Sequence, residues 1–227
     1  MKRSELNQIM RDALAFAAEN KFALPSFVIW SPEEWATKDS EYDEIKDNML
    51  GWDITDFGSG DFHKIGLLMI TLRNGNFHNP KYNKPYAEKL LISEEGQVTP
   101  YHFHWKKMED IINRGGGKLV LKCHNSSEDG SQMLDTPVTI YRDGRAYQVP
   151  AGERIVLERG ESITLPTGQY HSFWAEGGTC LVGEVSVINN DNDDNRFFEP
   201  IGRFPTIEED EQPLYLLFSE YPNMPAR

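Results

Sequence analysis

The chain has 227 residues, and its 23 basic and 36 acidic side chains give it a net charge of −13 at neutral pH. A surface of this sign repels phosphate backbones and anionic lipid headgroups, which argues against nucleic-acid and membrane-surface roles. No apolar run is long enough to cross a bilayer, and the first residues lack the apolar core of a signal peptide. Cys123 and Cys180 lie in strand-like runs and predict two buried free thiols, so we expect a cytoplasmic protein.

The N-terminal part of the chain predicts two helices and a strand. Apolar residues recur at helical spacing over residues 4–19, and Ser4 is a suitable N-cap. A second, short helix is expected after Ser31, because Pro32 suits the first position of a helix. The apolar run IGLLMITL at 65–72 predicts a strand.

From residue 86 onward, short apolar runs alternate with turns that contain glycine. Examples are QVTPYHFHW, KLVLKCH and TCLVGEVSVIN. Many short strands with this punctuation indicate a β-sandwich or β-barrel. We therefore expect one domain with an all-β core, made of a helical and strand extension at 1–85, a barrel at 86–190 and an extended, wrapping tail at 191–227.

The strongest functional signal is a set of four residues whose side chains bind metals. His102 and His104 are two positions apart, so on a strand both imidazoles point to the same face. Glu109 follows five positions later, and a turn or bulge between them can return its carboxylate to that face. His171 follows a turn with proline and glycine in LPTGQYH. An isolated histidine is usually an ordinary residue, but four ligand-type residues in two independent patterns favour a metal site.

These residues belong to two motifs. The first is glycine, HxH, Glu and Gly over residues 96–115, and the second is glycine, PxG and His over residues 160–171. Both motifs, in this order and at these spacings, resemble those of the cupin superfamily. The second motif often ends in Asn, where this chain has Ala175, but that position is not a ligand. The resemblance implies a cupin jelly-roll core, to which the N-terminal helices and the C-terminal tail are added.

Three imidazoles and one carboxylate suit a first-row divalent ion such as Mn, Fe, Co, Ni or Zn, whereas Ca and Mg prefer oxygen ligands. Four protein ligands leave two adjacent positions of an octahedral ion open. Two open positions suit a hydroxy-aldehyde or hydroxy-ketone held through vicinal oxygens, and they equally suit dioxygen together with a substrate. The fold alone does not choose between these reactions.

Several charged residues near the motifs are candidates for catalysis or substrate binding. Lys107 shares the ligand face if its stretch is extended, and Lys89 is a lone charge in an apolar run, although an exposed surface lysine is an equally good interpretation of each. Glu184 lies in the apolar run LVGEVSV, where an unpaired buried carboxylate is costly, so it either points outward or has a function. In the tail, Glu199 and Arg203 belong to segments that mix charges and aromatics, as sugar sites and dimer contacts do.

Beyond the two motifs, the whole layout resembles the D-lyxose isomerase group of cupins. The resemblance is carried by the opening helix and by EKLLI, TPYHFHWKKMEDIINRGGG, LPTGQYHSFWA and EVSVINNDNDDNRFFEPIGRFPTIEEDE. It implies an isomerase that converts D-lyxose to D-xylulose and D-mannose to D-fructose. It also implies one divalent metal ion per chain, usually Mn2+, and a cytoplasmic homodimer.

Carried onto this chain, the resemblance assigns the metal ligands to His102, His104, Glu109 and His171. Proton transfer between C1 and C2 through a cis-enediol requires a base that is not a ligand. We expect Glu199, then Glu184, then Lys107 in this role, with Lys107 favoured as the proton donor to oxygen. Lys89 and Arg203 are expected to bind the sugar.

Two other functions stay open at this point. A cupin dioxygenase uses the same ligands, but it needs a redox-active metal and usually an apolar pocket. A non-catalytic sugar-binding cupin often lacks some of the ligands, and this chain keeps all four. Activity with a redox-inert metal under anaerobic conditions separates the isomerase from the dioxygenase.

Overall fold

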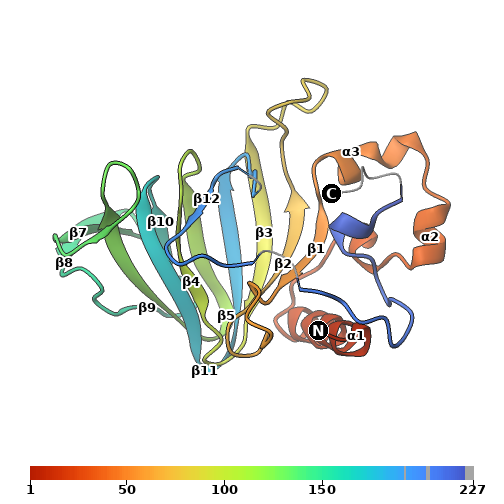
Figure 1. Cartoon of the computed structure of the whole chain (residues 1–227), viewed down its shortest axis with the longest axis horizontal. Coiled ribbons are helices and arrows are strands. Elements are labelled where there is room, and N and C mark those ends of the chain that lie inside the picture. Colours follow the sequence, from red (N-terminus) through yellow and green to blue (C-terminus); the bar gives the residue numbers. More distant parts are fainter. Residues whose placement is uncertain (192, 203–204, 223–227) are drawn as a thin grey trace.

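The computed structural model describes residues 1–191, 193–202 and 205–222, and its centre is an antiparallel β-sheet of 12 strands (Figure 1). The main path through the sheet runs β1-β2-β3-β11-β5-β10-β7-β8, while β4, β6, β9 and β12 pair beside it. The expected all-β core is confirmed. In chain order the strands are β1 (Gly51–Thr55), β2 (Leu67–Arg73), β3 (Tyr86–Ser93), β4 (Thr99–His104), β5 (Glu109–Ser126), β6 (Met133–Leu134), β7 (Val138–Arg142), β8 (Arg145–Val149), β9 (Ile155–Leu157), β10 (Ser162–Leu165), β11 (Gln169–Val187) and β12 (Asn195–Phe197).

The helices gather at the β1 end of the sheet, away from the β7–β8 hairpin, and all but η3 precede the first strand (Figure 1). They are α1 (Arg3–Glu19), α2 (Pro32–Ala36) and α3 (Asp43–Asp47), with the short 3-10 helices η1 (Ser26–Ile29), η2 (Ser40–Tyr42) and η3 (Phe218–Glu220). Helix α1 covers the outer face of the sheet. Its apolar residues join one buried cluster with those of β1, β2, β3 and β11, and the α1 members are Leu6, Ile9, Met10, Ala13 and Ala17. Among the described residues, no helix has the length and hydropathy required to span a bilayer.

The long strands β5 and β11 pair along most of their length and organise the rest of the sheet. Their register shifts between Glu176 and Cys180, where Gly177 and Gly178 have φ angles of 73° and 120°. Glycine adopts these left-handed angles without the strain that a side chain would bring. The first half of β11 also pairs with β4, and the second half pairs with β3. Strand β11 therefore contributes side chains to the interior both beside β4 and beside β3.

Side chains alternate between the two faces of β11, as the period of a strand requires. Val182, Glu184 and Ser186 are buried, whereas Val185 and Val187 between and beyond them are exposed. The interior therefore receives a carboxylate from an otherwise apolar strand. This resolves the ambiguity that the sequence left at Glu184, because its side chain points inward.

Helix α1 begins at Arg3, so the expectation that Ser4 is its N-cap is wrong. Arg3 is buried, and its guanidinium pairs with Glu209 and Glu220 from the far end of the chain. The Ser4 hydroxyl donates to the carboxylate of Asp210 at 2.7 Å instead of accepting from the helix. Contacts with the tail thus override the local capping preference.

Helix α2 begins as the sequence predicts. The Ser31 hydroxyl accepts the N–H of Glu34 at 3.2 Å, and the Glu34 carboxylate accepts the N–H of Ser31 at 2.8 Å. Pro32 is the first residue of the helix. This reciprocal pair satisfies two backbone donors that the helix leaves without partners.

The two cysteines are buried and unpaired, as the sequence predicts. Burial raises the pKa of both Cys123 and Cys180 to about 12. A thiol with such a pKa holds almost no thiolate at neutral pH, so both side chains act as small apolar core residues.

Candidate active site

Two paired strands bring three histidines together. His102 and His104 lie on the same face of β4, and His171 of β11 is the direct register partner of His102. All three side chains are buried. Their metal-binding nitrogen atoms all lie within 4.8 Å of one another, which is close enough for one ion to reach all three. The geometry that the HxH spacing predicts is thus present.

Backbone carbonyls orient two of the three rings. Nδ1 of His102 lies 2.8 Å from the carbonyl oxygen of Pro100, and Nδ1 of His171 lies 3.0 Å from that of Gln169. A carbonyl oxygen only accepts, so Nδ1 carries the proton and Nε2 keeps its lone pair. This is the tautomer that a metal-binding histidine needs, and such partners fix the direction of the ring.

Burial keeps two of these imidazoles neutral. It lowers the pKa of His102 well below the ordinary value, and the neighbouring His171 and His104 lower it further. Burial also lowers the pKa of His104, with an added contribution from the positive charge of Lys107. A neutral imidazole is the form that binds a metal ion.

Glu109 is the first residue of β5 and follows the turn at 105–108, which supplies the change of direction that the odd spacing requires. Its Oε1 atom lies 3.3 Å from Nε2 of His171, and its Oε2 atom lies 3.3 Å from Nε2 of His104. Burial alone would raise the pKa of Glu109, but Lys107 and His104 lower it well below the ordinary value. The site therefore holds a carboxylate against two of its three imidazoles.

Several atoms at this point are buried without a hydrogen-bond partner. Within the described part of the chain, they include both ring nitrogens of His104 and Nε2 of His171. Buried polar atoms without partners are rare because they lose the hydrogen bonds of water and gain nothing. A divalent ion would satisfy them, and a set of imidazole nitrogens with a carboxylate oxygen fits a first-row transition metal. The residues present therefore suit a metal ion.

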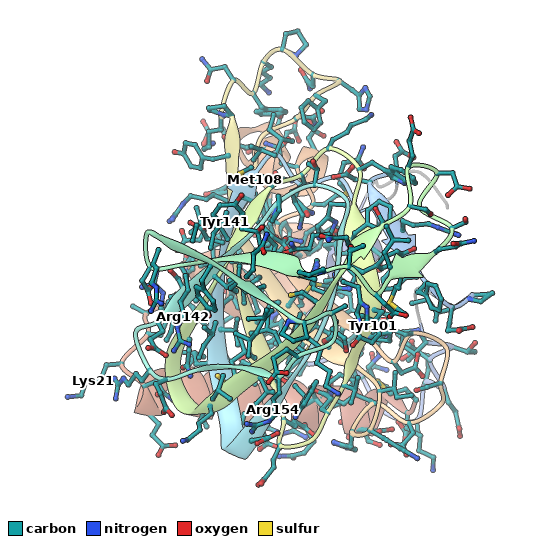
Figure 2. All side chains as sticks on the ribbon, turned by 90° about the vertical axis from the view of Figure 1, so that its left-hand side faces the viewer. Lys21, Tyr101, Met108, Tyr141, Arg142 and Arg154 are labelled. Carbon is teal, nitrogen blue, oxygen red and sulfur yellow. The ribbon has the colours of Figure 1, made fainter. Side chains whose placement is uncertain are left out.

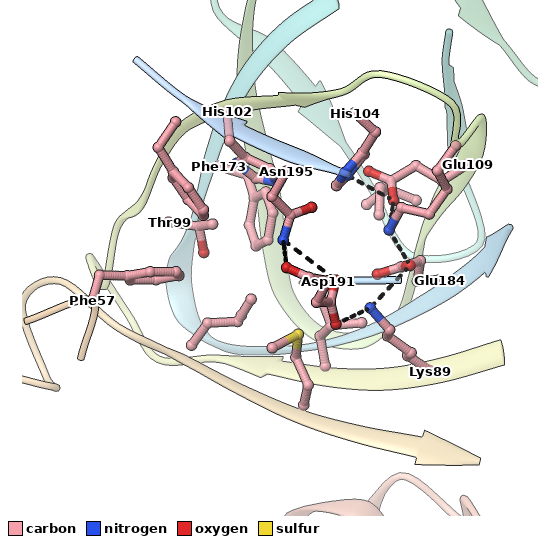
Figure 3. A pocket seen from close by; sticks show the side chains of 16 residues that line it. Phe57, Lys89, Thr99, His102, His104, Glu109, Phe173, Glu184, Asp191 and Asn195 are labelled. Carbon is pink, nitrogen blue, oxygen red and sulfur yellow. Dashed lines mark hydrogen bonds and ion pairs between the residues drawn. The ribbon is translucent and has the colours of Figure 1, made fainter. Parts of the chain in front are cut away.

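His102 and His104 open onto a cavity (Figure 3). Charged and amide side chains from β3, the turn between β4 and β5, β11 and the tail form one part of its wall, namely Lys89, Lys107, Glu184, Asp191 and Asn195. Apolar side chains form the other part, namely Phe57, Leu67, Met69, Leu91, Ile111, Phe173 and Phe197. Such a division suits a small ligand with hydroxyl groups on a carbon chain.

A chain of buried charges runs through the polar part of the wall. Nζ of Lys107 lies 2.6 Å from Oε2 of Glu109 and 2.8 Å from Oε1 of Glu184. Nζ of Lys89 lies 3.5 Å from the same Glu184 oxygen and 3.3 Å from Oδ2 of Asp191. Burial would lower the pKa of Lys107, but the carboxylates of Glu109, Glu184 and Asp191 raise it overall. Lys107 is therefore an ammonium group at neutral pH.

The structure brings together most of the residues that the sequence selects, but not all of them. Lys89, Lys107 and Glu184 line the cavity with His102, His104 and Glu109. Glu199 is exposed and is not among the residues that line it. Since Asn195 and Phe197 of β12 line the cavity, the chain has already left its rim before residue 199. Arg203 lies outside the described residues.

Sequence reasoning missed two residues of the site, Asp191 and Asn195, which the tail contributes. They belong to the run DNDDN at 191–195, which begins a few residues after the end of β11. Five consecutive polar residues after a buried strand were a usable signal, but the run did not indicate which of its members face inward.

Comparisons with known proteins find relatives that match nearly the whole chain. A family model described as D-lyxose isomerase matches residues 1–221. The D-lyxose/D-mannose isomerase of Serratia proteamaculans is 48% identical over 225 residues, which cover 97% of this chain and 98% of that protein. The protein of the same name from Escherichia coli O157:H7 is 45% identical over 224 residues, with coverage of 97% and 98%.

Among solved structures, a mutant L-ribose isomerase of Acinetobacter sp. DL28 in complex with L-ribose is similar, with a TM-score of 0.61. The match covers 92% of this chain and 98% of that chain at 15% sequence identity. At this identity the likeness speaks for the fold alone. Together with the large antiparallel sheet, it confirms the expected cupin-type fold.

Proposed function

This chain belongs to the D-lyxose isomerase family, and from that premise we propose that it is a metal-dependent aldose–ketose isomerase acting on D-lyxose and D-xylulose. D-mannose and D-fructose, which each have one more carbon, are the second proposed pair. One observation carries the proposal: His102 and His104 of the three-histidine group line the same cavity as the Lys107–Glu184 ion pair. The first group suits binding of sugar oxygens through a metal ion, and the second suits proton transfer.

The proposed ligands of one divalent ion per chain are His102, His104, Glu109 and His171, with Mn2+ favoured by the family resemblance. When bound, such an ion supplies Lewis-acid polarisation of the sugar oxygens. The support for this ligand set is the orientation of His102 and His171 by backbone carbonyls, the lowered pKa of His102 and His104, and the lowered pKa of the Glu109 carboxyl. His102, His104 and Glu109 are thus already in the protonation state that metal binding requires.

We assign the movement of the proton between C1 and C2 to Glu184. Its carboxylate lines the cavity and is not one of the proposed metal ligands, so it is free to take and return a proton. Lys107, which stays protonated, is placed to donate to the sugar oxygen on which negative charge develops. The 2.8 Å contact between the two side chains supports a shared role. The exposed position of Glu199 makes it the weaker candidate for the base.

The remaining polar residues are assigned to substrate binding. Lys89, Asp191 and Asn195 form the part of the wall where hydroxyl groups along the sugar chain would find partners. Donors and acceptors in fixed positions hold such a chain in the orientation that the reaction needs. Arg203 stays a proposed substrate-binding residue outside the described part of the chain.

We also propose that the protein is a homodimer, and the outer face of the sheet supports this. Tyr86, Val185, Val187, Met108 and Tyr141 are each more than 40% exposed. Tyr86 and Val187 are register partners, and Val187 bonds through its N–H to the carbonyl of Met108. Figure 2, which turns the β7–β8 end of the molecule to the viewer, labels Met108 and Tyr141. Apolar groups gathered on one face favour a partner that covers them.

The proposed compartment is the cytoplasm. Two buried thiols that form no disulfide with each other are typical of proteins kept in reducing surroundings. A count of free thiols in protein isolated without reductant and then unfolded tests this, and two thiols per chain are expected.

The experiment that tests the isomerase proposal starts from metal-free protein. Mn2+, Co2+, Ni2+, Zn2+ and Mg2+ are added singly, D-lyxose, D-mannose, L-ribose and D-xylose are supplied as substrates, and ketose is measured with and without oxygen. We expect ketose from D-lyxose with a redox-inert ion in the absence of oxygen. No ketose from any aldose with any ion would contradict the proposal, and turnover that requires oxygen would favour a dioxygenase.

A further inference from the structure

Asp194 lies in the tail, directly before β12, and does not line the cavity. Its side chain is 5% exposed. Oδ1 accepts the backbone N–H of Lys106 at 2.7 Å, and Oδ2 accepts the backbone N–H of Lys107 at 2.9 Å. Its own carbonyl oxygen accepts the N–H of Trp105 at 3.1 Å. One residue of the tail thus holds three consecutive N–H groups of the turn between β4 and β5.

This turn connects the HxH strand to the strand that begins with Glu109. Within it, Lys106 is exposed and Lys107 is buried. The orientation of the peptide between these two residues therefore determines which lysine enters the cavity. Nζ of Lys107 contacts Glu109 and Glu184. The position of the Lys107 main chain in the turn therefore sets where its ammonium group lies. The two N–H groups that Asp194 accepts belong to the peptides on either side of Lys106.

Hydrogen bonds from N–H groups to an ionised carboxylate are shorter and stronger than bonds between neutral groups. A buried carboxylate is costly unless such bonds satisfy it, so the tail and the turn stabilise each other only in this arrangement. Without the carboxylate, the turn would keep its connection to β4 and β5 but lose the contact that selects the direction of Lys107. The backbone bond from Trp105 would remain in any variant of the side chain.

We propose that Asp194 is a positioning residue for the isomerase reaction, because its carboxylate fixes the turn that directs Lys107 to Glu184. The kinetic tests of this inference rest on the proposed function, because they measure turnover. The test that measures the position of Lys107 does not. It assigns to the tail a second task besides contributing Asp191 and Asn195 to the cavity wall. Asp194 would not touch the sugar and would act through Lys107.

Kinetics of two variants test the inference. Asp194→Asn keeps the size and one acceptor but turns an N–H donor toward another donor, and Asp194→Ala removes both acceptors. A displacement of catalytic groups by about 1 Å can lower the rate about 10²-fold, so we expect a fall of kcat approaching this in Asp194→Ala and a smaller fall in Asp194→Asn. KM should change less than kcat. Asp193→Asn, the same charge change at the exposed neighbouring residue, is the matched control.

A double-mutant cycle separates positioning from loss of stability. If Asp194 acts through Lys107, then Asp194→Ala combined with Lys107→Met should lower kcat no further than Lys107→Met alone. Kinetics are normalised to the fraction of folded protein, so a merely structural role would leave kcat per folded molecule unchanged. A fully additive loss in the double variant would overturn the inference, as would an unchanged kcat in Asp194→Ala.

Chemical labelling supplies a readout that does not need turnover. An amine-acylating reagent should modify buried Lys107 slowly in the wild type and faster in Asp194→Ala and Asp194→Asn, with exposed Lys106 as the internal reference and Asp193→Asn as the control. Equal labelling of Lys107 in all four proteins would overturn the inference. If the wild type converts no aldose, the proposed function fails, and faster labelling of Lys107 in the variants still supports the positional claim.

Discussion

His171 and His102 are direct register partners on antiparallel strands, and the centroids of their rings lie 4.2 Å apart. Each ring is turned by the carbonyl oxygen of the residue two positions before it. The two strands thus contribute matching elements, a histidine and the carbonyl that orients it.

Removal of His171 should remove the metal. His171→Ala takes away one of three imidazoles whose nitrogens lie within 4.8 Å of one another, and a first-row ion held by fewer ligands dissociates more readily. Metal analysis after gel filtration should show full loading of the wild type and of the exposed-site control His78→Ala, but little in His171→Ala. Circular dichroism checks that the barrel is folded. Full occupancy in His171→Ala would exclude His171 from the ligand set.

Substitution of Glu184 should slow turnover without loss of metal. General acid–base groups contribute roughly 10² to 10⁴-fold, so Glu184→Gln should lower kcat by about that factor. Glu199→Gln tests the rival base, and we expect the larger loss in Glu184→Gln because only Glu184 lines the cavity. A larger loss in Glu199→Gln, measured at equal metal content, would return the role of base to Glu199.

Isomerisation in heavy water should leave solvent deuterium on the carbon that receives the proton. A carboxylate that removes a proton from one carbon exchanges this proton with the solvent, at least in part, before it returns a proton to the neighbouring carbon. Mass spectrometry of the ketose formed from D-lyxose measures this. Complete absence of deuterium, together with transfer of label from C2 to C1 of a C2-deuterated aldose, would instead indicate a hydride shift and reduce Glu184 and Lys107 to substrate positioning.

The exposed apolar face should be covered by a second chain. Val185→Asp places a charge in the middle of this face, where the register pairs Val185 with Glu88 and Asp110, so burial against a partner becomes unfavourable. Sedimentation should show a dimer for the wild type and for Gln132→Asp, which adds the same charge at an exposed loop residue, and a monomer for Val185→Asp. A monomeric wild type would contradict the proposed assembly itself.

The ion pair of His63 with Glu94 should make stability depend on pH. Nδ1 of His63 lies 2.6 Å from the Glu94 carboxylate, and this hydrogen bond raises the pKa of His63. A raised pKa means that the stabilisation is complete below about pH 6.5, the value in the unfolded chain, and is lost as the pH rises through the folded value. His63 is 57% exposed, so the contribution should stay within about 1 kcal/mol.

Urea unfolding of the wild type and of His63→Gln at pH 6 and pH 9 measures this contribution. The difference in the free energy of unfolding between the two proteins should be present at pH 6 and should shrink at pH 9. An equal difference at both pH values would show that the pair does not titrate in this range.

The sequence by itself determined the features that depend on near neighbours in the chain. The helical spacing over residues 4–19, the capping residue Ser31 and the shared face of His102 and His104 all follow from the fixed periods of helix and strand. The motif pair also indicated His171 and Glu109, because its spacings are those of a known constellation. Alternation along a strand does not state which of its two faces is the inner one, so Glu184 and the lysines 106 and 107 stayed ambiguous.

Tertiary structure alone decided those choices, because each depends on residues that are distant in the sequence. Glu184 faces inward because Val182, on the same face of β11, packs into the central core, whereas Leu181 on the other face packs against α1. Lys107 enters the cavity in place of Lys106 where Asp194 holds the turn. Asp191, in the segment before β12, lines the cavity, whereas Glu199 lies beyond the end of β12 and does not. Local patterns fix only the direction of a side chain relative to its own element, whereas the packing of elements decides whether that direction leads to solvent or to the interior.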